Sequence, residues 1–219
     1  MMDGPDPKRR RARSVAAKRD RRDQIVATVR DLWAERTFAT LTMADVAERC
    51  GLAKGTLYLY FATKEQLLLG LLEAELVAWF DDLDARLAIS GRSNAAELAD
   101  LIVAALTLRP VLVRLLPIAA SILEQNIAPD AALSYKQLLL DRSLRSGVAI
   151  DRCYGLSSGD GTWLLLQLYA LAVGLGQMAD PAPVVAAVLR DPAMAPLRVD
   201  FAPALRRSLL ALLHGIVKI

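Results

Sequence analysis

The amino-acid sequence predicts an all-α protein, and three observations support this prediction. Of the 219 residues, 54% are hydrophobic, which is enough to bury a sizeable core and argues against wholesale disorder. Leucine and alanine dominate, aromatic residues make up only 5% of the chain, and alternating β-branched runs are scarce, so helix is favoured over strand. Helix-capping residues and Pro or Gly boundaries recur along the chain and divide the helical pattern into segments.

The first residues form a strongly basic segment, although the whole chain has a formal net charge of only +3. The basic side chains of this segment are Lys8, Arg9, Arg10, Arg11, Arg13, Lys18, Arg19, Arg21 and Arg22. We expect residues 1–17 to be a disordered arm. Such an arm either meets a polyanion or is a solvated tail, and charge alone does not separate these alternatives.

Residues 18–65 predict a small unit of three helices. The first helix is expected to begin near Lys18. Its apolar stripe consists of Ile25, Val29, Leu32 and Trp33. The second helix begins at Thr42, a good N-cap, and the carboxylate of Asp45 faces the free N–H groups of its first turn. Gly51 ends this helix, because glycine readily adopts the left-handed C-terminal turn.

The second and third helices, joined by a tight turn at Gly51, have the pattern of a helix-turn-helix. The third helix is expected over residues 54–61, and Ala47 is small where the two helices would approach most closely. In this motif the later helix lies in the major groove of double-stranded DNA. The residues on it that suit base edges, phosphates or close backbone approach are Lys54, Gly55, Thr56, Tyr58 and Tyr60.

The segment GLAKGTLYLYFATKEQLL, at residues 51–68, resembles the signature of TetR-family regulators. The resemblance implies an all-helical homodimer with an N-terminal three-helix DNA-binding head and a variable C-terminal domain for ligand binding and dimerisation. By position it implies base contacts from Lys54, Gly55 and Thr56, and phosphate contacts from Thr42, Tyr58, Tyr60 and Lys64. Two residues depart from the family pattern. Ala53 replaces a frequent serine, and Leu59 replaces an aromatic or histidine residue that often touches phosphate.

Residues 66–219 are predicted to form the ligand-binding and dimerisation domain. A long helix starts at Thr63, with Gln66 in a capping box. Further helices are expected at 94–108, 110–126, 129–147, 158–178, around 184–189, and 200–217. A pocket for a mostly apolar small-molecule ligand is expected among the helices between 94 and 178. The predicted ligand contacts are Arg114, Gln125, Tyr135, Trp163, Gln167 and Tyr169.

The last two long helices carry apolar faces suited to a homodimer. The face on 158–178 consists of Leu164, Leu168, Leu171 and Leu175, with Gly174 permitting close approach. The face on 200–217 consists of Leu205, Leu209, Leu212 and Ile216. Burial of these faces within one subunit is the alternative.

No catalytic set, metal-ligand spacing or cofactor motif is recognisable, so we expect neither an enzyme nor a metal or cofactor site. Cys50 and Cys153 fit a reduced, cytoplasmic compartment, and the apolar run 163–179 is slightly short for a membrane span. The leading hypothesis is a repressor released from a palindromic operator by its ligand. The alternatives are a ligand-independent or nucleoid-associated DNA-binding protein of the same fold, and a small helical enzyme or lipid-binding protein.

Overall fold

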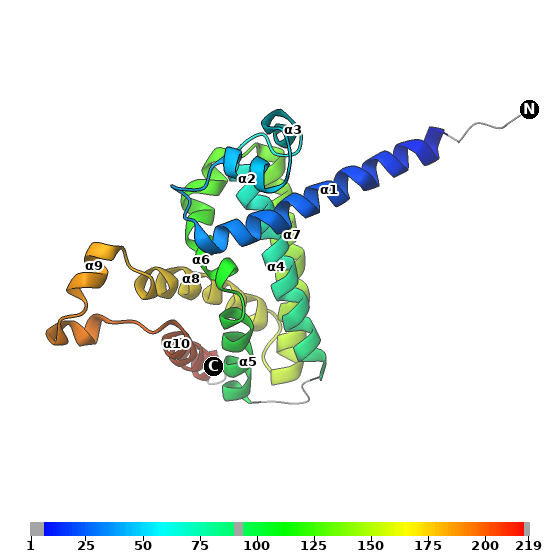
Figure 1. The fold of residues 1–219 in the computed structure, drawn as a ribbon. Helices are drawn as coiled ribbons and strands as arrows, with labels where there is room; N and C mark the ends of the chain where they lie inside the picture. The colour runs from blue at the N-terminus through cyan, green and yellow to red at the C-terminus, as the bar shows by residue number, and fades with distance from the viewer. Residues whose placement is uncertain (1–6, 90–93, 217–219) are drawn as a thin grey trace, which may run out of the picture. The chain divides into compact units, whose positions relative to one another are not determined.

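A computed structural model describes residues 7–89 and 94–216, and every regular element in these ranges is helical, as predicted (Figure 1). The chain divides into two compact units, Met1–Leu71 and Leu72–Ile219. The boundary falls within α4 (Lys64–Ile89), a short way beyond the predicted boundary at residue 65. The residues of α4 are therefore divided between the two units.

Unit 1 consists of α1 (Pro7–Glu35), α2 (Met43–Arg49), α3 (Lys54–Tyr58) and the start of α4. The predicted start of the first helix near Lys18 is wrong, because residues 7–17 are helical where the sequence predicted a disordered arm. These residues are mostly Arg, Lys and Ala, which are good helix formers, and contain no internal Gly or Pro. Residues 1–6 of the predicted arm lie outside the described part of the chain.

The apolar stripe of α1 forms the core of unit 1, as predicted. Ile25, Val29, Leu32 and Trp33 are all buried. Val46 and Ala47 from α2 and Leu57 from α3 are also buried, so α2 and α3 each contribute one face to this core. At the start of α4, the Gln66 N–H donates to Thr63 Oγ1 at 3.1 Å. In the predicted capping box the Gln66 side chain would accept from Thr63 N–H. It accepts from Ala62 N–H instead.

The turn between α2 and α3 depends on Gly51. Its φ is +62°, its N–H donates to Glu48 O at 3.0 Å, and Leu52 N–H donates to Ala47 O at 2.8 Å. This pair of hydrogen bonds is the Schellman arrangement, which satisfies the last carbonyl groups of a helix and needs a left-handed residue. The sequence prediction for Gly51 is therefore confirmed.

We expect Gly51→Ala to lower the free energy of unfolding by about 1 kcal/mol, since a Cβ disfavours the left-handed conformation. An added Cβ meets no atom within 4 Å, so the loss comes from backbone conformation and not from a clash. Urea unfolding measures it. Asparagine tolerates this conformation better, and an equal loss in Gly51→Asn would contradict the explanation.

Unit 2 contains the rest of α4 and the helices that follow it. Their bounds are α5 (Ala95–Thr107), α6 (Pro110–Ile118), α7 (Pro129–Tyr154), α8 (Asp160–Ala179), α9 (Pro183–Val188) and α10 (Phe201–Ile216). Short non-α turns, η1 (Ala119–Leu123), η2 (Glu124–Asn126) and η3 (Pro192–Leu197), complete the unit. The π-type turn η1 directly follows Pro117, whose missing N–H interrupts the regular α pattern.

The predicted end of the seventh helix at Gly147 is wrong. α7 continues to Tyr154 and ends with Gly155 at φ +65°. Gly147 lies against the start of α8, where a Cβ on it would stand 2.7 Å from Thr162 N, and Gly161 faces Gly147 in the same way. Two glycines thus let the backbones of α7 and α8 touch, and Gly147 is a packing residue instead of a helix stop.

Asp151 fixes the connection between α7 and α8. Its carboxylate accepts from Gly159 N–H at 2.9 Å and from Gly161 N–H at 2.6 Å. Both N–H groups belong to the first turn of α8, which has no side-chain cap from its own N-cap residue. A carboxylate at this position satisfies free donors and opposes the positive end of the helix dipole.

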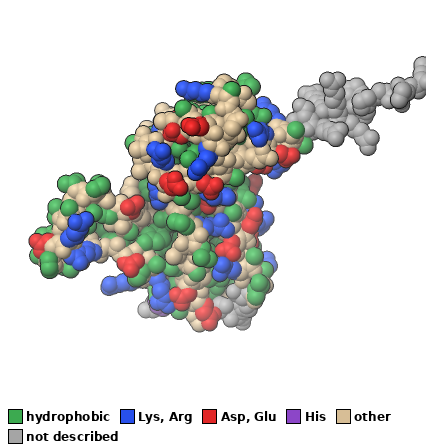
Figure 2. All heavy atoms as spheres, viewed as in Figure 1, with side chains coloured by type: hydrophobic (Ala, Val, Ile, Leu, Met, Phe, Trp, Pro, Cys, Tyr) green, Lys and Arg blue, Asp and Glu red, His purple; other side chains and the backbone are tan. Residues whose placement is uncertain are grey.

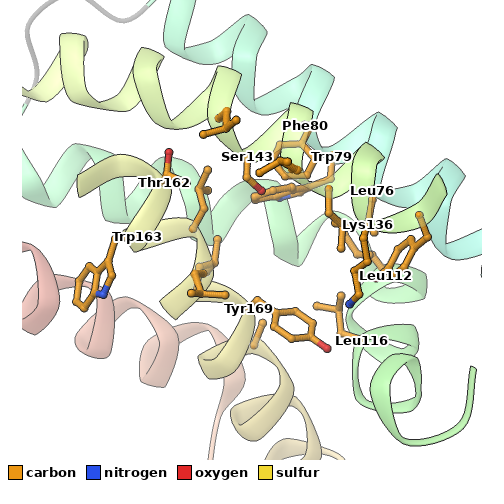
Figure 3. Close-up of a pocket in the computed structure, with 18 of the residues that line it drawn as sticks. Leu76, Trp79, Phe80, Leu112, Leu116, Lys136, Ser143, Thr162, Trp163 and Tyr169 are labelled. Carbon is orange, nitrogen blue, oxygen red and sulfur yellow. The ribbon is translucent and has the colours of Figure 1, made fainter. Parts of the chain in front are cut away.

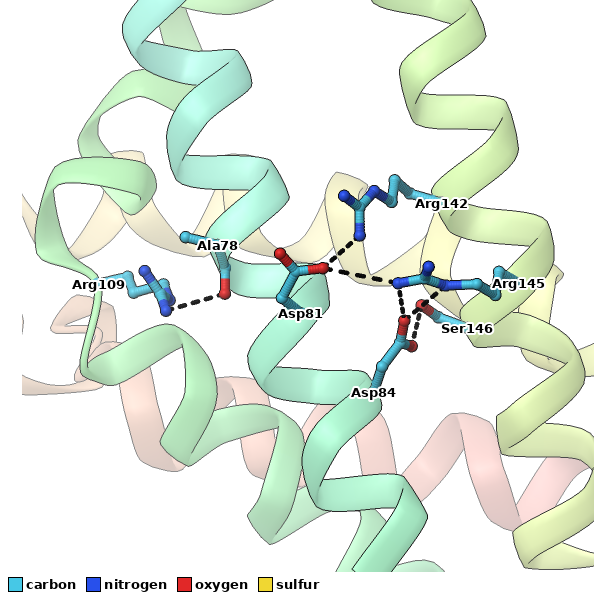
Figure 4. Close-up of polar contacts among 7 residues, drawn as sticks. All are labelled: Ala78, Asp81, Asp84, Arg109, Arg142, Arg145 and Ser146. Carbon is cyan, nitrogen blue, oxygen red and sulfur yellow. Dashed lines mark hydrogen bonds and ion pairs between the residues drawn. The ribbon is translucent and has the colours of Figure 1, made fainter. Parts of the chain in front are cut away.

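Ion pairs join α4 to α7 (Figure 4). Asp81 pairs with Arg142 and Arg145. Asp84 accepts from Arg145 Nε at 2.8 Å and from Ser146 Oγ at 2.6 Å. We call these five residues the α4–α7 clamp. The Cys153 thiol, which donates to Leu87 O at 3.4 Å, adds a further contact between these two helices.

The predicted dimer faces are partly wrong. Leu164 and Leu168 of α8 and Leu205 and Leu209 of α10 are buried within one chain, because α8 packs against α10 as well as α6 and α7. By length and composition alone, α8 could cross a membrane, as could the bent pair Ala95–Thr107 and Pro110–Asn126 taken together. Only 22% of the apolar window of α8 is buried within this chain, so one apolar face of the helix stays open.

The segment with α9 and η3 extends away from the other helices of unit 2 (Figure 1). Neither element contains a buried residue, and Figure 2 shows hydrophobic side chains on its surface. The large exposed ones are Val184, Val185, Val188 and Leu197. This segment therefore contributes no residue to the buried core of unit 2.

Candidate functional site

Thr42 caps α2, as predicted. Its hydroxyl accepts from Asp45 N–H at 3.2 Å and donates to Asp45 Oδ2 at 2.8 Å, while Thr42 N–H donates to the same carboxylate at 3.0 Å. These bonds hold the pKa of Asp45 below its ordinary value, the side-chain bond from Thr42 being the larger cause. Thr42 is exposed, so the capped end of α2 is open to solvent.

The first residues of α3 point outward. Lys54 and Gly55 are exposed and Thr56 is half-buried, whereas Leu57 is fully buried and fixes the inner face of the helix. A Cβ on Gly55 would meet no atom within 4 Å. Gly55 therefore has no packing role within the described part of the chain, although glycine lowers helix stability. Its missing side chain leaves room for something outside the chain.

The two tyrosines of the motif differ in exposure. Tyr58 is 43% exposed and lies on the same helix as Lys54. Tyr60 is half-buried, which fits a buried ring with its hydroxyl near the surface. Leu59 is 74% exposed. It stands where the family pattern has an aromatic or histidine residue that often touches phosphate, and its apolar side chain cannot make that hydrogen bond.

Lys64 is held within unit 1. Its Nζ donates to Phe38 O at 2.7 Å and lies 4.0 Å from the centre of the Phe38 ring. An ammonium group has three donors, so a second contact remains chemically open. The sequence motif did not identify this internal role. A similar internal contact places the Arg22 guanidinium 4.5 Å from the Phe61 ring centre.

A cavity of about 710 Å³ lies within unit 2 (Figure 3). Of the six predicted ligand contacts, Tyr135, Trp163 and Tyr169 line it. Trp163 lies at its edge and is 44% exposed. Arg114, Gln125 and Gln167 do not line it, and Gln125 is exposed. The sequence places these polar residues on helices of the predicted pocket region but does not show which way their side chains face.

The α4 wall of the cavity was missed. Leu76, Trp79 and Phe80 line it, whereas the sequence predicted a pocket only among the helices between 94 and 178. The charged lining residues are Glu124 and Lys136, which form an ion pair at 2.8 Å. Leucines from α5, α6, α7 and α8 make up most of the remaining wall. The cavity is thus an apolar chamber with a few polar groups.

Comparisons with known proteins decide the family. Residues 25–71 match the family model of the bacterial regulatory proteins of the tetR family, and residues 73–218 match that of the tetracyclin repressor-like C-terminal domain. The chain belongs to the TetR family. It is a DNA-binding transcriptional regulator and not an enzyme, and its helix-turn-helix is the DNA-binding element of the family.

Individual relatives agree with this assignment. The structure is similar to that of a possible TetR family transcriptional regulator from Streptomyces coelicolor A3(2). The match covers 90% of this chain and 98% of that one, with 25% sequence identity and a TM-score of 0.57. A transcriptional regulator from Rhodococcus sp. Rha1, with 18% identity, 90% and 96% coverage and a TM-score of 0.53, shares the fold. The uncharacterized HTH-type transcriptional regulator YerO of Bacillus subtilis is 39% identical over 54 residues, which span 25% of this chain and only 19% of that relative.

Proposed function

We propose that this TetR-family regulator is a cytoplasmic repressor that binds a palindromic operator as a homodimer and is released by a small, mostly apolar ligand. The observation that carries the proposal is the combination of an α3 whose outer face has no packing role and an apolar cavity in the second unit. A ligand-independent regulator has no need of such a cavity.

The outer face of α3 suits the major groove. Lys54 can donate to guanine O6 or N7, and Thr56 offers a hydroxyl and a methyl group. At Gly55 the helix backbone can approach a base edge or phosphate. Thr42, Tyr58, Tyr60 and Lys64 are proposed phosphate contacts. For Lys64 this contact would be made while the side chain stays on Phe38 O.

The helix α4 offers a physical route from ligand to DNA. Its first turns belong to unit 1, and its later turns bring Leu76, Trp79 and Phe80 to the cavity. A ligand that pushes on these side chains moves one end of a continuous helix whose other end belongs to the DNA-binding unit. Successive major grooves on one side of DNA lie about 34–36 Å apart. Ligand binding then favours dimers in which the distance between the two DNA-binding heads does not match this spacing.

The homodimer is proposed to form through the exposed sides of α8 and α10. On α8, Leu166 is 63% exposed, Ala170 is exposed, and a Cβ on Gly174 would meet no atom within 4 Å. These positions follow one another at a spacing of one helical turn, so they share a face opposite the buried Leu164 and Leu168. This proposed face keeps Gly174 from the sequence prediction and has Leu166 and Ala170 in place of the buried Leu164 and Leu168.

We expect Ala170→Arg to convert the dimer to monomer, because it places a charge and a long side chain in a close helix–helix contact. Sedimentation velocity measures the change. Ala104→Arg on α5, also exposed, is the matched control and should leave the dimer intact. A dimer that survives Ala170→Arg would move the interface elsewhere.

The DNA-binding part of the proposal is tested with Lys54→Ala. Using an operator selected from random duplex DNA, we expect specific affinity to fall by about 1–3 kcal/mol, while non-specific affinity falls much less. Gel-shift titrations measure both affinities. Arg190→Ala removes an equal charge from an exposed position in unit 2 and should change neither. Equal losses of specific and non-specific binding would reassign Lys54 to a phosphate contact.

A further inference from the structure

The cavity contains hydrogen-bond donors without partners. Tyr135 is only 2% exposed, yet among the described residues its phenolic hydroxyl has no hydrogen-bond partner. The hydroxyl of Tyr169 likewise has none within the described part of the chain, and the Trp79 indole N–H is buried without an acceptor there. Buried donors normally have acceptors, so the Trp79 N–H indicates an acceptor from outside the chain. Tyr135, which is buried, and Tyr169, which is 36% exposed, line the same cavity, and their hydroxyls are open to an acceptor placed there.

The phenols act as donors because they stay protonated. Burial raises the pKa of Tyr135 above its ordinary value, and the nearby Glu124 carboxylate raises it further. The same two causes, in the same order, raise the pKa of Tyr169. Both side chains are therefore neutral phenols at neutral pH, and each offers one O–H donor to an acceptor in the cavity.

The charges of the lining residues favour an uncharged ligand. Glu124 and Lys136 neutralise each other at 2.8 Å. A cationic ligand would have to displace Lys136 from Glu124, and an anionic one would face the carboxylate near both phenols. Moving an unpaired charge into an apolar chamber is strongly unfavourable. The volume of about 710 Å³ falls within the ~300–1,000 Å³ typical of small-molecule sites.

We propose that the ligand of this cavity is an uncharged, ring-containing, largely apolar molecule with a carbonyl oxygen that accepts hydrogen bonds from Tyr135 and Tyr169. The aromatic rings of Trp79, Phe80 and Tyr169 (Figure 3) pack against its ring system. This inference rests on the proposed function, because it takes the cavity as the effector site.

The experiment compares neutral and charged three-ring probes by calorimetric titration into the full chain without DNA. The probes are 9-fluorenone, fluorene, 9-fluorenone-4-carboxylate and the cation proflavine. We expect fluorenone to bind more tightly than either charged probe. Tyr135→Phe, which removes only the hydroxyl, should weaken fluorenone about fivefold and leave fluorene, which lacks the carbonyl, unchanged. Tyr154→Phe, at a half-buried tyrosine of unit 2 that does not line the cavity, is the matched control and should affect neither.

Three outcomes overturn the inference. The first is that fluorenone fails to bind, and the second is that a charged probe binds more tightly than fluorenone. The third is that Tyr135→Phe changes the affinities for fluorenone and fluorene by the same factor. The proposed function has its own readout, a titration of fluorenone into the operator complex. If fluorenone binds the free protein but leaves that complex intact, ligand-released regulation is contradicted while the ligand class stands.

Discussion

Replacing Gly147 with alanine will lower the free energy of unfolding by about 3 kcal/mol, at the upper end of the usual range for overpacking. The new Cβ would stand 2.7 Å from Thr162 N and 2.9 Å from Thr162 Cα. These are backbone atoms, so no side chain can rotate away to make room. The crossing of α7 and α8 has to widen, and the Gly161 contact with Gly147 is lost at the same time. Chemical denaturation followed by circular dichroism measures the loss.

Gly215→Ala is the matched control for this prediction. Gly215 also lies in a helix of unit 2, but a Cβ there would meet no atom within 4 Å. Alanine is the better helix former, so this variant should be as stable as the original chain or slightly more stable. If the two variants had equal stability, Gly147 would have no special role in the crossing.

Replacing Gly55 with leucine will separate DNA binding from stability. Leucine favours helix more than glycine does, and the space beside Gly55 is open, so we expect unfolding stability to be unchanged or raised by up to about 1 kcal/mol. Specific operator affinity should fall roughly 100-fold, about 3 kcal/mol, because the side chain occupies the space between the α3 backbone and the groove. Fluorescence anisotropy with labelled operator measures this loss.

Ala104→Leu serves as the control, since it adds a leucine at an exposed helical position of unit 2, on α5, outside the proposed dimer interface. Its operator affinity should match that of the original chain. A Gly55→Leu protein that binds the operator normally would show that α3 does not approach DNA at this position. Loss of stability in Gly55→Leu would instead reveal an internal contact that the structure does not contain.

Local chemistry explains which parts of the fold the sequence predicted. The cap at Thr42 and the turn at Gly51 involve residues within a few positions of each other, so their residue types and spacing were sufficient. Gly147 was misinterpreted with the same rule that succeeded at Gly51. The difference lies in Thr162, a partner distant in sequence that only the packing of α7 on α8 brings near.

The second unit shows the same limit for apolar faces and pockets. The periodicity of Leu164, Leu168, Leu205 and Leu209 correctly marked them as interior positions, but periodicity does not reveal whether the covering surface comes from the same chain. The α4 wall of the cavity escaped prediction because Trp79 and Phe80 look like ordinary core residues in the sequence. Their position beside a cavity depends on how α6, α7 and α8 pack around it.

The α4–α7 clamp makes one side of the cavity sensitive to ionic strength. Asp81 and Arg145 have side-chain exposures of 57% and 59%, so dissolved salt screens their attraction. The glycine contact between α7 and α8 involves no charge and keeps its strength. Added salt therefore weakens the contact between α4 and α7 more than the contact between α7 and α8. If the cavity holds the proposed ligand, we expect its exchange to accelerate as salt is added.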